Sequence, residues 1–278
     1  MITTTKQNIT RCKPYLGTYV EVSVTGEKSA ADLIQTSESI FNEIKKIDTM
    51  MNAHNPNSEL SFINQNAFKT NCRLSKDIYI VIKKALELSQ LTNGNFDITL
   101  PKLPTLKNTN KVANWQDICL KKTTIQFRKK LTIDLGGIAK GYAVDKAMEI
   151  IKDPSIEVCI NAGGDIRMTH WKQKIAHIKV GCSEKKHLIP IKMKNTSIAT
   201  SSHYYTENTP SSIIHPHTKK PDKNPHTISI FAPNCMLADA LTKVIWLNPK
   251  DHSLLPLFDA TAIIHDKKGI DITKENLK

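Results

Sequence analysis

The stretch IDLGGIAKGYAVDKA, residues 133–147, places an aspartate, two adjacent glycines and a lysine in front of a helical pattern. A strand that ends in a glycine turn before a helix leaves backbone N–H groups free to bind phosphate, and the helix dipole favours the same anion. Glycine also permits a positive φ and a close approach by a ligand. Lys140 would add a positive charge, and Asp134 would hold a sugar hydroxyl, an amide or a metal-bound water. The residues therefore indicate a phosphate site, with a purely structural strand–helix turn as the alternative.

A second glycine turn, NAGGD at residues 161–165, follows another expected strand. Neither turn is a standard phosphate signature. GGIAKG departs from G-x-G-x-x-G, and the Walker pattern needs Gly-Lys-Ser/Thr, whereas Lys140 precedes Gly141. Two such turns, each with an aspartate, nevertheless favour a shared cleft for a polyphosphate.

Short strands and separate blocks of helix must position these turns. Alternation predicts a strand over 17–26, and helical spacing over 29–49 predicts one broad apolar face formed by Ala31, Ile34, Ile40, Ile44 and Ile47. Ser75 and Asp77 predict the start of a second helix that ends at TNGN, residues 92–95. Strands are expected at TTIQF, on both sides of NAGGD, within 175–200 and at 226–232, and a compact apolar helix at MLADALTKVIWL. Because strands mostly adjoin strands, the pattern predicts an α+β fold with mixed or antiparallel sheets.

Composition limits the function classes. The 278 residues are enough for one domain over 1–278 with two intimate lobes, whose boundary the sequence does not resolve. The formal charge of +13 comes almost entirely from scattered lysines. Arginine is the better residue for forked phosphate contacts, so this distribution predicts a solvated surface and no nucleic-acid partner. The six cysteines never form C-x-x-C, and we expect separate, mostly buried thiols.

No apolar stretch is long enough to span a bilayer, and the first residues lack the apolar run of a signal peptide. We therefore expect no membrane segment in this chain and a cytoplasmic location. A periplasmic or membrane-anchored location applies if a leader has been removed.

Several segments together resemble one family, the FAD:protein FMN transferases, or ApbE family. The resemblance is carried in one order by LGTYVEVSV, MMNAHNPNSELSFIN, GNFDITLPKL, DLGGIAKGYAVD, NAGGD, SIATSSHYY and APNCMLADALTKVIWL. These seven segments are distributed over about 240 residues of the chain, which makes the resemblance far more specific than any single glycine motif. The chain is identified as a divergent member.

The resemblance implies a two-lobed fold with FAD in a cleft between the lobes. It also implies magnesium and an acceptor flavoprotein: FMN would pass from FAD to a threonine or serine hydroxyl, and AMP would be released. Such phosphoryl-type transfer relies on metal ions and positioned donors that stabilise charge around the attacked phosphorus.

The resemblance also assigns residues to roles. Lys140, Asp134 and the Leu16 that stands in place of the family's usual methionine would contact FAD. The other positions implied to bind FAD are Asn95, Phe96, Asp97, Asn161, Asp165, Thr200 and Ser201. Asp239 would be a catalytic residue and the carboxylate ligand of magnesium, a hard cation that prefers oxygen, together with the backbone at Gly137. Phe96 has a core role as its alternative, and Asp165 and Ser201 have turn-capping roles as theirs.

Two positions depart from the family pattern. A threonine that helps to bind magnesium usually follows the aspartate by four residues, but Lys243 stands there. The i,i+4 spacing predicts an Asp239–Lys243 pair, worth about 0.3–0.5 kcal/mol if it is a surface ion pair. Three readings stay open: Lys243 takes over part of the cation's role, Thr242 becomes the oxygen ligand, or the metal site is weakened.

The second departure concerns the base that would activate the acceptor hydroxyl. The family commonly has His-Ile-Ile-Asp-Pro-x-Thr-Gly, whereas this chain has Ser212-Ile-Ile-His215-Pro-His217-Thr218-Lys219. His215 would therefore act as the base from a shifted position. His215 and His217 share one face of an extended segment, so a transition-metal site and two exposed loop histidines are the alternatives.

Three functions follow from these residues. The first is magnesium-dependent FMN transfer to a flavoprotein. The second is a non-catalytic relative that holds FAD or FMN, which the Lys243 and Ser212 departures favour. The third is an FAD pyrophosphatase that yields FMN and AMP with water as acceptor.

Overall fold

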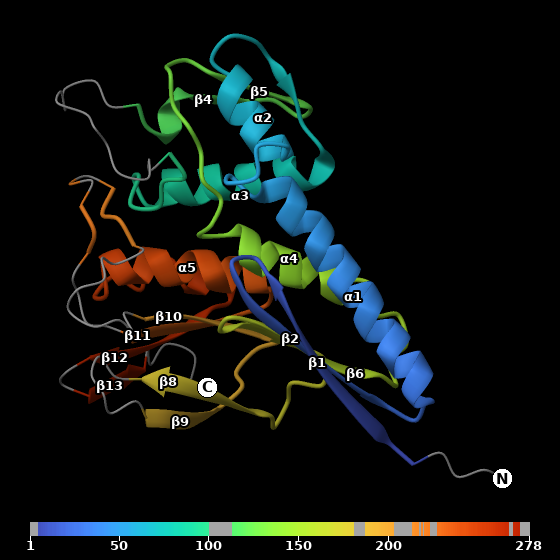
Figure 1. Ribbon diagram of the computed structural model, residues 1–278. Helices are drawn as coiled ribbons and strands as arrows, with labels where there is room; N and C mark the ends of the chain where they lie inside the picture. The colour runs from blue at the N-terminus through green and yellow to red at the C-terminus, as the bar shows by residue number, and fades with distance from the viewer. Residues whose placement is uncertain are drawn as a thin grey trace. The chain divides into compact units, whose positions relative to one another are not determined.

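The computed structural model describes residues 5–99, 113–180, 187–202, 213–216, 218, 220–222, 227–266 and 269–272 (Figure 1). The chain divides into two compact units. Unit 1 comprises residues 1–48, 140–206 and 225–278, and unit 2 comprises residues 49–139 and 207–224. Helices and antiparallel sheets together confirm the α+β class predicted from the sequence.

Unit 1 is built on an eight-stranded sheet in which every pairing is antiparallel. In spatial order its strands are β1 (Gln7–Tyr15), β2 (Thr18–Gly26), β6 (Glu157–Ala162), β7 (Asp165–Met168), β10 (Ser197–Ser202), β11 (Thr227–Ala232), β12 (Thr261–Asp266) and β13 (Gly269–Ile272). The β6–β7 hairpin contains the NAGGD turn, so this sheet holds one of the two predicted glycine turns in place.

Three helices of unit 1 pack on one face of this sheet: α1 (Ala30–Met51), α4 (Ala139–Met148) and α5 (Cys235–Leu247) (Figure 1). Val20, Val22 and Val24 of β2 are fully buried in a core shared with α1 and α4. Each such side chain contributes about 1.5–3 kcal/mol through burial. A hairpin of β8 (Ile175–Val180) and β9 (His187–Lys192) covers the opposite face through a second apolar cluster that includes Ile178, Ile198 and Phe231.

Coverage on both faces explains why every residue of β11 is buried, although TISIFA contains two hydroxyl residues. Helix α5 packs against β10 and β11 on one side, and Phe231 belongs to the cluster under the β8–β9 hairpin on the other. A central strand that is covered on both faces has a continuous run of buried residues, instead of buried and exposed residues in alternation.

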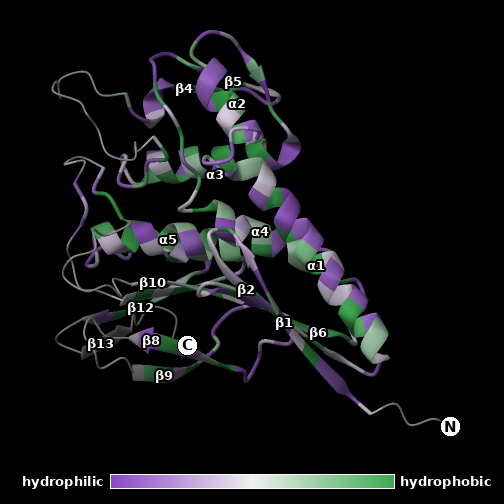
Figure 2. Ribbon diagram, in the orientation of Figure 1, coloured by the Kyte–Doolittle hydropathy of each residue, from purple (hydrophilic) through white to green (hydrophobic). Residues whose placement is uncertain are grey.

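The predicted helix over 29–49 is confirmed as α1, but its apolar face differs from the predicted one. Figure 2 shows hydrophobic and hydrophilic residues mixed along α1. Ile40, Ile44 and Ile47 are buried as expected, whereas Ile34 is 44 % exposed and Ala31 is also exposed. Leu33 and Phe41 fill the core instead, because the buried stripe lies closer to their side of the helix.

Unit 2 contains α2 (Glu59–Asn66), α3 (Lys76–Leu91), the 3-10 turns of Trp115–Asp117, and a sheet with the order β3 (Cys72–Arg73), β5 (Thr124–Phe127), β4 (Ile118–Leu120). The predicted start of α3 is confirmed, because the Ser75 side chain accepts a hydrogen bond from Ile78 N at 3.3 Å. Ser58 caps α2 in the same way.

The expected strand before Asp134 is wrong. Residues 131–135 belong to no sheet, and at Ile133 the side-chain amide of Asn64 takes the place of a neighbouring strand. Asn64 accepts from Ile133 N at 2.8 Å and donates to Ile133 O at 2.9 Å. Asp134 N donates to Ile98 O at 2.8 Å, and the Asp134 carboxylate then accepts from Gly136 N at 2.7 Å, which turns the chain towards α4.

The expectation of separate, mostly buried cysteines is confirmed only in part. The described cysteines are all free, as expected, but only Cys72 and Cys235 are buried; Cys119 and Cys159 are half-buried and Cys12 is exposed.

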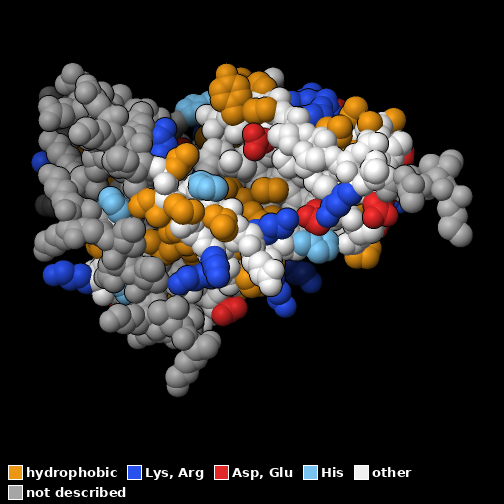
Figure 3. Space-filling view, turned by 90° about the horizontal axis from the view of Figure 1, so that it is seen from below, with side chains coloured by type: hydrophobic (Ala, Val, Ile, Leu, Met, Phe, Trp, Pro, Cys, Tyr) orange, Lys and Arg blue, Asp and Glu red, His pale blue; other side chains and the backbone are white. Residues whose placement is uncertain are grey.

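On the face seen in Figure 3, Lys and Arg side chains are dispersed among hydrophobic and acidic ones rather than gathered in a stripe. No helix among the described residues has both the length and the apolar character needed to cross a membrane.

Candidate active site with a buried lysine–aspartate cluster

Asp239 lies on the second turn of α5 and is fully buried in unit 1. A buried carboxylate is costly unless it is paired and hydrogen-bonded. The helix that carries it has a well-defined start, because the Asn234 side chain accepts from Leu237 N at 2.9 Å. An Asp145 carboxylate on α4 accepts from Cys235 N and Met236 N, each at 2.8 Å. These contacts fix the register of α5 and hence the position of Asp239.

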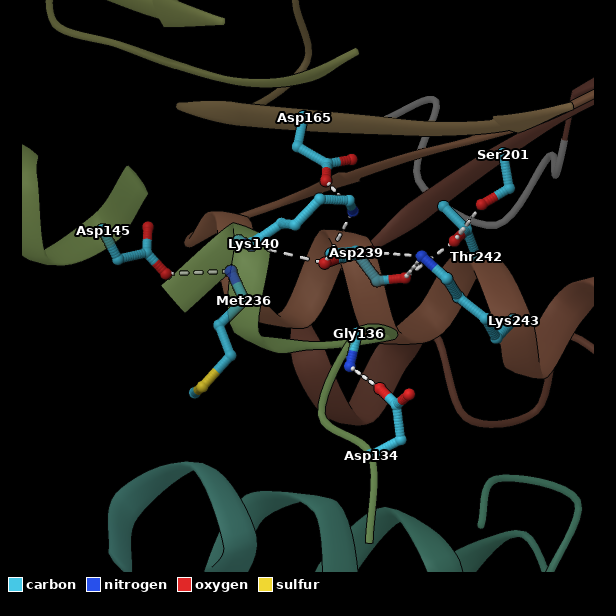
Figure 4. Close-up of polar contacts among 11 residues, drawn as sticks. Asp134, Gly136, Lys140, Asp145, Asp165, Ser201, Met236, Asp239, Thr242 and Lys243 are labelled. Atoms are coloured by element: carbon cyan, nitrogen blue, oxygen red, sulfur yellow. Dashed lines mark hydrogen bonds and ion pairs between the residues drawn. The ribbon is translucent and has the colours of Figure 1, made fainter. Parts of the chain in front are cut away.

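Lys140, on the first turn of α4, contacts two carboxylates (Figure 4). Its ammonium group pairs with Asp165 Oδ2 and lies 3.3 Å from Asp239 Oδ2. Gly141 N also donates to Asp239 Oδ2 at 3.3 Å. This approach requires glycine, since a Cβ at position 141 would lie 2.2 Å from Cys235 O. The motif at residues 133–147 therefore places both the Lys140 ammonium and the Gly141 N–H against Asp239.

Lys243 supplies the second ammonium group. It pairs with Asp239 Oδ1 and also donates to Asp239 O at 3.0 Å (Figure 4). The i,i+4 pair predicted from the sequence is present, but it is not a surface ion pair, because Asp239 is 0 % exposed. Asp165, Asp239, Lys140 and Lys243, together the lysine–aspartate cluster, contain two carboxylates and two ammonium groups. The cluster is electrically balanced.

Burial and neighbouring charges shift the pKa values of the two carboxylates in the cluster in opposite directions. Burial of the Lys140 ammonium acts to lower its pKa, but Asp165 and Asp239 outweigh this and hold the pKa well above its usual value. Burial, reinforced by the neighbouring Asp239 charge, raises the pKa of Asp165. Burial acts in the same direction on Asp239, but Lys140 and Lys243 outweigh it and lower that pKa. Of the two carboxylates, Asp239 is therefore the one whose ionised form is the more strongly favoured.

Hydroxyl groups extend the cluster towards strand β10. The Thr242 hydroxyl is fully buried, donates to Asp239 O at 2.7 Å and lies 2.8 Å from Ser201 Oγ. Thr200 Oγ1 lies 2.8 Å from Ser229 Oγ on β11, opposite it in register. The structure thus brings the predicted residues Thr242 and Ser201 together beside Asp239, whereas Thr200 pairs with the neighbouring strand.

The β6–β7 turn delivers Asp165 to the cluster. Asn161 Oδ1 accepts from Gly164 N at 2.9 Å, and Gly163 and Gly164 both have positive φ, at 64° and 102°. A Cβ at Gly163 would also lie 2.5 Å from Thr18 Oγ1. Glycine is therefore required for the sharp reversal, and Asp165 follows at the first position of β7, 3 % exposed.

Leu16 lies at the tip of the β1–β2 hairpin in the same unit. It adopts φ 58° and is followed by Gly17 at φ 69°, which is the backbone geometry of a tight two-residue hairpin turn. Its side chain packs against the core cluster of β2 and α1.

The remaining predicted residues belong to unit 2. Phe96 is 5 % exposed, so its side chain is largely buried. The Asp97 carboxylate accepts from Thr99 N at 2.8 Å and from Thr99 Oγ1 at 2.7 Å, while Asn95 N donates to Thr92 O at 3.1 Å. Asp134 turns the chain onto Gly136, and the half-buried Gly137 sits in the same turn.

His215 is also in unit 2. Its backbone N–H donates to Lys220 O at 2.9 Å, and its Nδ1 lies 3.4 Å from Thr218 N. Ser212, His217 and Lys219, which carry the rest of the departure from the family motif, lie outside the described residues.

Sequence reasoning missed Asp145 and Arg167. Arg167 on β7 pairs with Asp145 on α4, and the same carboxylate binds the start of α5. A signal was present in the sequence, because Asp145 interrupts an apolar helix between Val144 and Ala147, both of which are fully buried. An acidic residue on a buried face needs a partner, and Arg167 is one of only four arginines in the chain.

Comparison with known proteins links this chain to one family. A sequence model described as "ApbE family" matches residues 16–257. A FAD:protein FMN transferase of Vibrio cholerae is 25 % identical over 260 residues, which cover 82 % of this chain and 78 % of the relative. A FAD:protein FMN transferase of Chlamydia pneumoniae is 27 % identical over 245 residues, which cover 78 % and 77 %.

Solved structures agree in fold. The ApbE protein of Thermotoga maritima superposes with a TM-score of 0.82 at 22 % identity, over 96 % of this chain and 97 % of that one. The flavin transferase ApbE of Vibrio cholerae gives 0.81 at 21 % identity, over the same shares. The match of residues 16–257 and these folds confirm the resemblance predicted from the motifs.

Proposed function

The chain belongs to the ApbE family, and from this membership we propose that it transfers FMN from FAD to a threonine or serine hydroxyl of an acceptor flavoprotein. In this reaction the hydroxyl oxygen forms a bond to the phosphorus of the FMN half. The bond between that phosphorus and the bridging oxygen breaks, and AMP leaves with the bridging oxygen. The proton of the hydroxyl passes to a base, for which His215 is the candidate in this chain.

The observation that carries this proposal is the lysine–aspartate cluster. The carboxylates of Asp165 and Asp239 are buried, whereas the Lys140 and Lys243 side chains keep 28 % and 21 % of their surface exposed. The carboxylates therefore hold two ammonium groups in place at the edge of solvent. Fixed cations of this kind stabilise the charge that develops on phosphoryl oxygens during transfer.

The other roles rest on the family resemblance. We propose that Asp134 and the turn residues Asn161 and Asp165 contact FAD. The further FAD contacts in this proposal are Leu16, Asn95, Phe96, Asp97, Thr200 and Ser201.

Magnesium remains a prediction from the resemblance, with Gly137, Asp239 and Thr242 as its implied ligands. The contacts of Asp239 do not fit it. Both oxygens of that carboxylate accept from ammonium groups, and the Thr242 hydroxyl donates to Asp239 O. Magnesium favours an octahedral set of oxygen ligands, and the oxygens on α5 are engaged elsewhere.

The test is incubation of the purified protein with FAD and a peptide that contains an acceptor threonine. Chromatography measures AMP and FMN, and mass spectrometry measures the peptide. AMP release in step with a peptide that gains one FMN is the expected result. FAD that stays bound and intact indicates the non-catalytic flavin-binding alternative, and AMP with free FMN but unmodified peptide indicates the pyrophosphatase.

Matched variants locate the chemistry. Asp239→Asn keeps the shape of the side chain but removes the charge that orients Lys140 and Lys243, so AMP release should fall at least a hundredfold. Glu149→Gln, directly after α4, changes an exposed carboxylate that pairs with Lys146 at the surface, and it should leave the rate unchanged. Equal AMP release by both variants contradicts a role for Asp239.

A further inference from the structure

Both oxygens of the Asp239 carboxylate accept hydrogen bonds from nitrogen donors of the same chain. Oδ1 accepts from Lys243 Nζ, and Oδ2 accepts from Lys140 Nζ and Gly141 N, both at 3.3 Å (Figure 4). All three donors come from two helices that Asp145 joins through the backbone of Cys235 and Met236. This arrangement is part of the packed interior, because Asp239 has no exposed surface.

Charge balance in the cluster opposes the entry of a divalent cation. The two ammonium groups already neutralise the carboxylates of Asp165 and Asp239. Adding two positive charges within contact distance of Lys140 and Lys243 would create strong repulsion where water screens little. Lys243 would have to leave Asp239 first, and it is held there at two points, the carboxylate and the backbone oxygen at 3.0 Å.

The neighbouring oxygen atoms do not form an alternative metal site. Thr242 Oγ1 donates to Asp239 O at 2.7 Å and lies 2.8 Å from Ser201 Oγ, so this hydroxyl is already part of a hydrogen-bond chain. Within the described part of the chain, no three His, Cys, Asp or Glu residues gather as a set that could hold a metal ion.

We propose that the Lys243 ammonium is the built-in cation of this site, so that Asp239 binds no divalent metal and FMN transfer proceeds without one. The buried Asp239 holds the ammonium through two of its three N–H groups, and the third would donate to a phosphoryl oxygen of the donor. Lys243 is therefore a catalytic residue in this proposal, because its charge acts directly on the donor, and Asp239 is the residue that positions it. The catalytic half of this inference rests on the proposed function, whereas the metal half rests on the contacts of Asp239 alone.

The test measures Mn²⁺, which substitutes for Mg²⁺ at oxygen sites and is counted when free by electron paramagnetic resonance. The wild-type protein is compared with Lys243→Thr, which places a hydroxyl oxygen on the same helix face four residues after Asp239. The double variant Asp239→Asn/Lys243→Thr is the control, because it keeps the new hydroxyl but lacks the carboxylate. Lys243→Gln offers an uncharged oxygen on a longer stem if the threonine variant does not fold.

We expect wild-type protein and the double variant to give the same Mn²⁺ titration, set by weak surface sites. Lys243→Thr should bind Mn²⁺ at least tenfold more tightly than either. Its thermal midpoint should also rise with added Mg²⁺, because a ligand that binds only the folded state stabilises it, while the wild-type midpoint should not. Asp239-dependent Mn²⁺ binding by the wild type, or no gain in Lys243→Thr and Lys243→Gln, overturns the proposal.

Activity distinguishes failure of this inference from failure of the proposed function. With the chelator EDTA present, wild-type protein should release AMP at its full rate, whereas Lys243→Thr should require added Mg²⁺. AMP release by the wild type that falls at least tenfold with EDTA and returns with Mg²⁺ overturns the inference but supports the transferase. No AMP from either protein under any condition contradicts the proposed function, and the Mn²⁺ titration then decides the metal question by itself.

Discussion

Asp145 and Met236 join the two helices that carry the lysine–aspartate cluster. Asp145 Oδ2 on α4 accepts a hydrogen bond of 2.8 Å from Met236 N at the start of α5 (Figure 4). The carboxylate also accepts from Cys235 N and pairs with Arg167, so it satisfies two of the donors that a helix N-terminus leaves unpaired. Lys140 and Asp239 lie one to two turns away on these same helices, and their contact depends on this junction.

Replacing Asp145 should therefore loosen the site as well as the fold. Asp145→Asn keeps the side-chain volume but removes the charge that Arg167 and two backbone N–H groups share. We expect the free energy of unfolding to fall by about 2–3 kcal/mol, as for other hydrogen bonds to a charged group. Urea unfolding measures the change. FAD affinity should fall with it, which equilibrium dialysis measures.

Glu149→Gln is the matched control for Asp145→Asn. Glu149 follows α4 directly and pairs with Lys146 at the surface, with 60 % of its side chain exposed. Its loss should cost less than about 0.5 kcal/mol. A similar loss in both variants contradicts the view that Asp145 anchors α5.

Gly141 should tolerate no side chain. A Cβ there would meet Cys235 O at 2.2 Å and Met236 N at 2.7 Å, both backbone atoms. Gly141→Ala should therefore push α4 from the start of α5 and destabilise the protein by about 1–3 kcal/mol, as overpacking does in other cores. It should also abolish FAD binding, because the Gly141 N–H and Lys140 would both move away from Asp239.

Gly26→Ala is the comparison for Gly141→Ala. A Cβ at Gly26 would meet Ile156 and Leu33 at 3.6–3.7 Å, which is ordinary contact. Stability should stay the same or rise by about 0.4–1 kcal/mol through the unfolded chain. Thermal unfolding of the two variants shows whether the loss at Gly141 comes from close packing or from replacing any glycine. Equal changes in stability for Gly141→Ala and Gly26→Ala would contradict a close approach of α4 to α5.

Local patterns predicted most elements of the fold, and they missed what depends on distant partners. The Ser75 cap, the α5 helix and the β6–β7 hairpin follow from residues within a few positions of one another, and all three are confirmed. The strand expected before Asp134 failed because the hydrogen-bond partner of Ile133 is the side chain of Asn64, 69 residues away. An alternating pattern shows that a segment is extended, but not what it pairs with.

The candidate site, too, could be predicted only in part from local sequence patterns. The Asp239–Lys243 pair is readable from its i,i+4 spacing, but its burial is not, since that depends on how α5 packs on β10 and β11. The meeting of Lys140 with Asp165 and Asp239 joins residues 25 and 99 positions apart. Without the family motifs, no spacing rule would have brought these three residues together.

Asp153 should make stability depend on acid pH. Hydrogen bonds from the Ser155 hydroxyl and N–H, together with Lys28, lower the pKa of Asp153 from 3.8 to about 2. A carboxyl whose pKa is lower in the folded state adds stability above its unfolded pKa and loses it as the pH falls through the folded pKa. The stability difference between wild type and Asp153→Asn should therefore be full near neutral pH and shrink between 3.8 and about 2.

Urea unfolding of both proteins at pH values on either side of this window measures the Asp153 effect. Asp48→Asn is the control, because the same substitution removes an acidic charge on α1 outside the Ser155 and Lys28 contacts of Asp153. A difference between wild type and Asp153→Asn that grows as the pH falls would have the wrong sign and would contradict the assignment.

Lys140→Met should give a stability loss that increases with pH. Lys140 separates the two buried carboxylates, and burial together with the Asp239 charge already raises the pKa of Asp165. Removing the ammonium should raise that pKa further. A carboxyl with a higher pKa in the folded state contributes fully below its unfolded pKa and loses that stability as the pH rises through the folded pKa. We expect a loss of about 2–3 kcal/mol at neutral pH, as when a buried ion pair loses a partly exposed partner, and a smaller loss at mildly acidic pH. Lys146→Met, on the same helix but paired with the exposed Glu149, should show a small loss at both. An equal stability loss at both pH values would contradict the view that the Lys140 ammonium keeps Asp165 and Asp239 ionised next to each other.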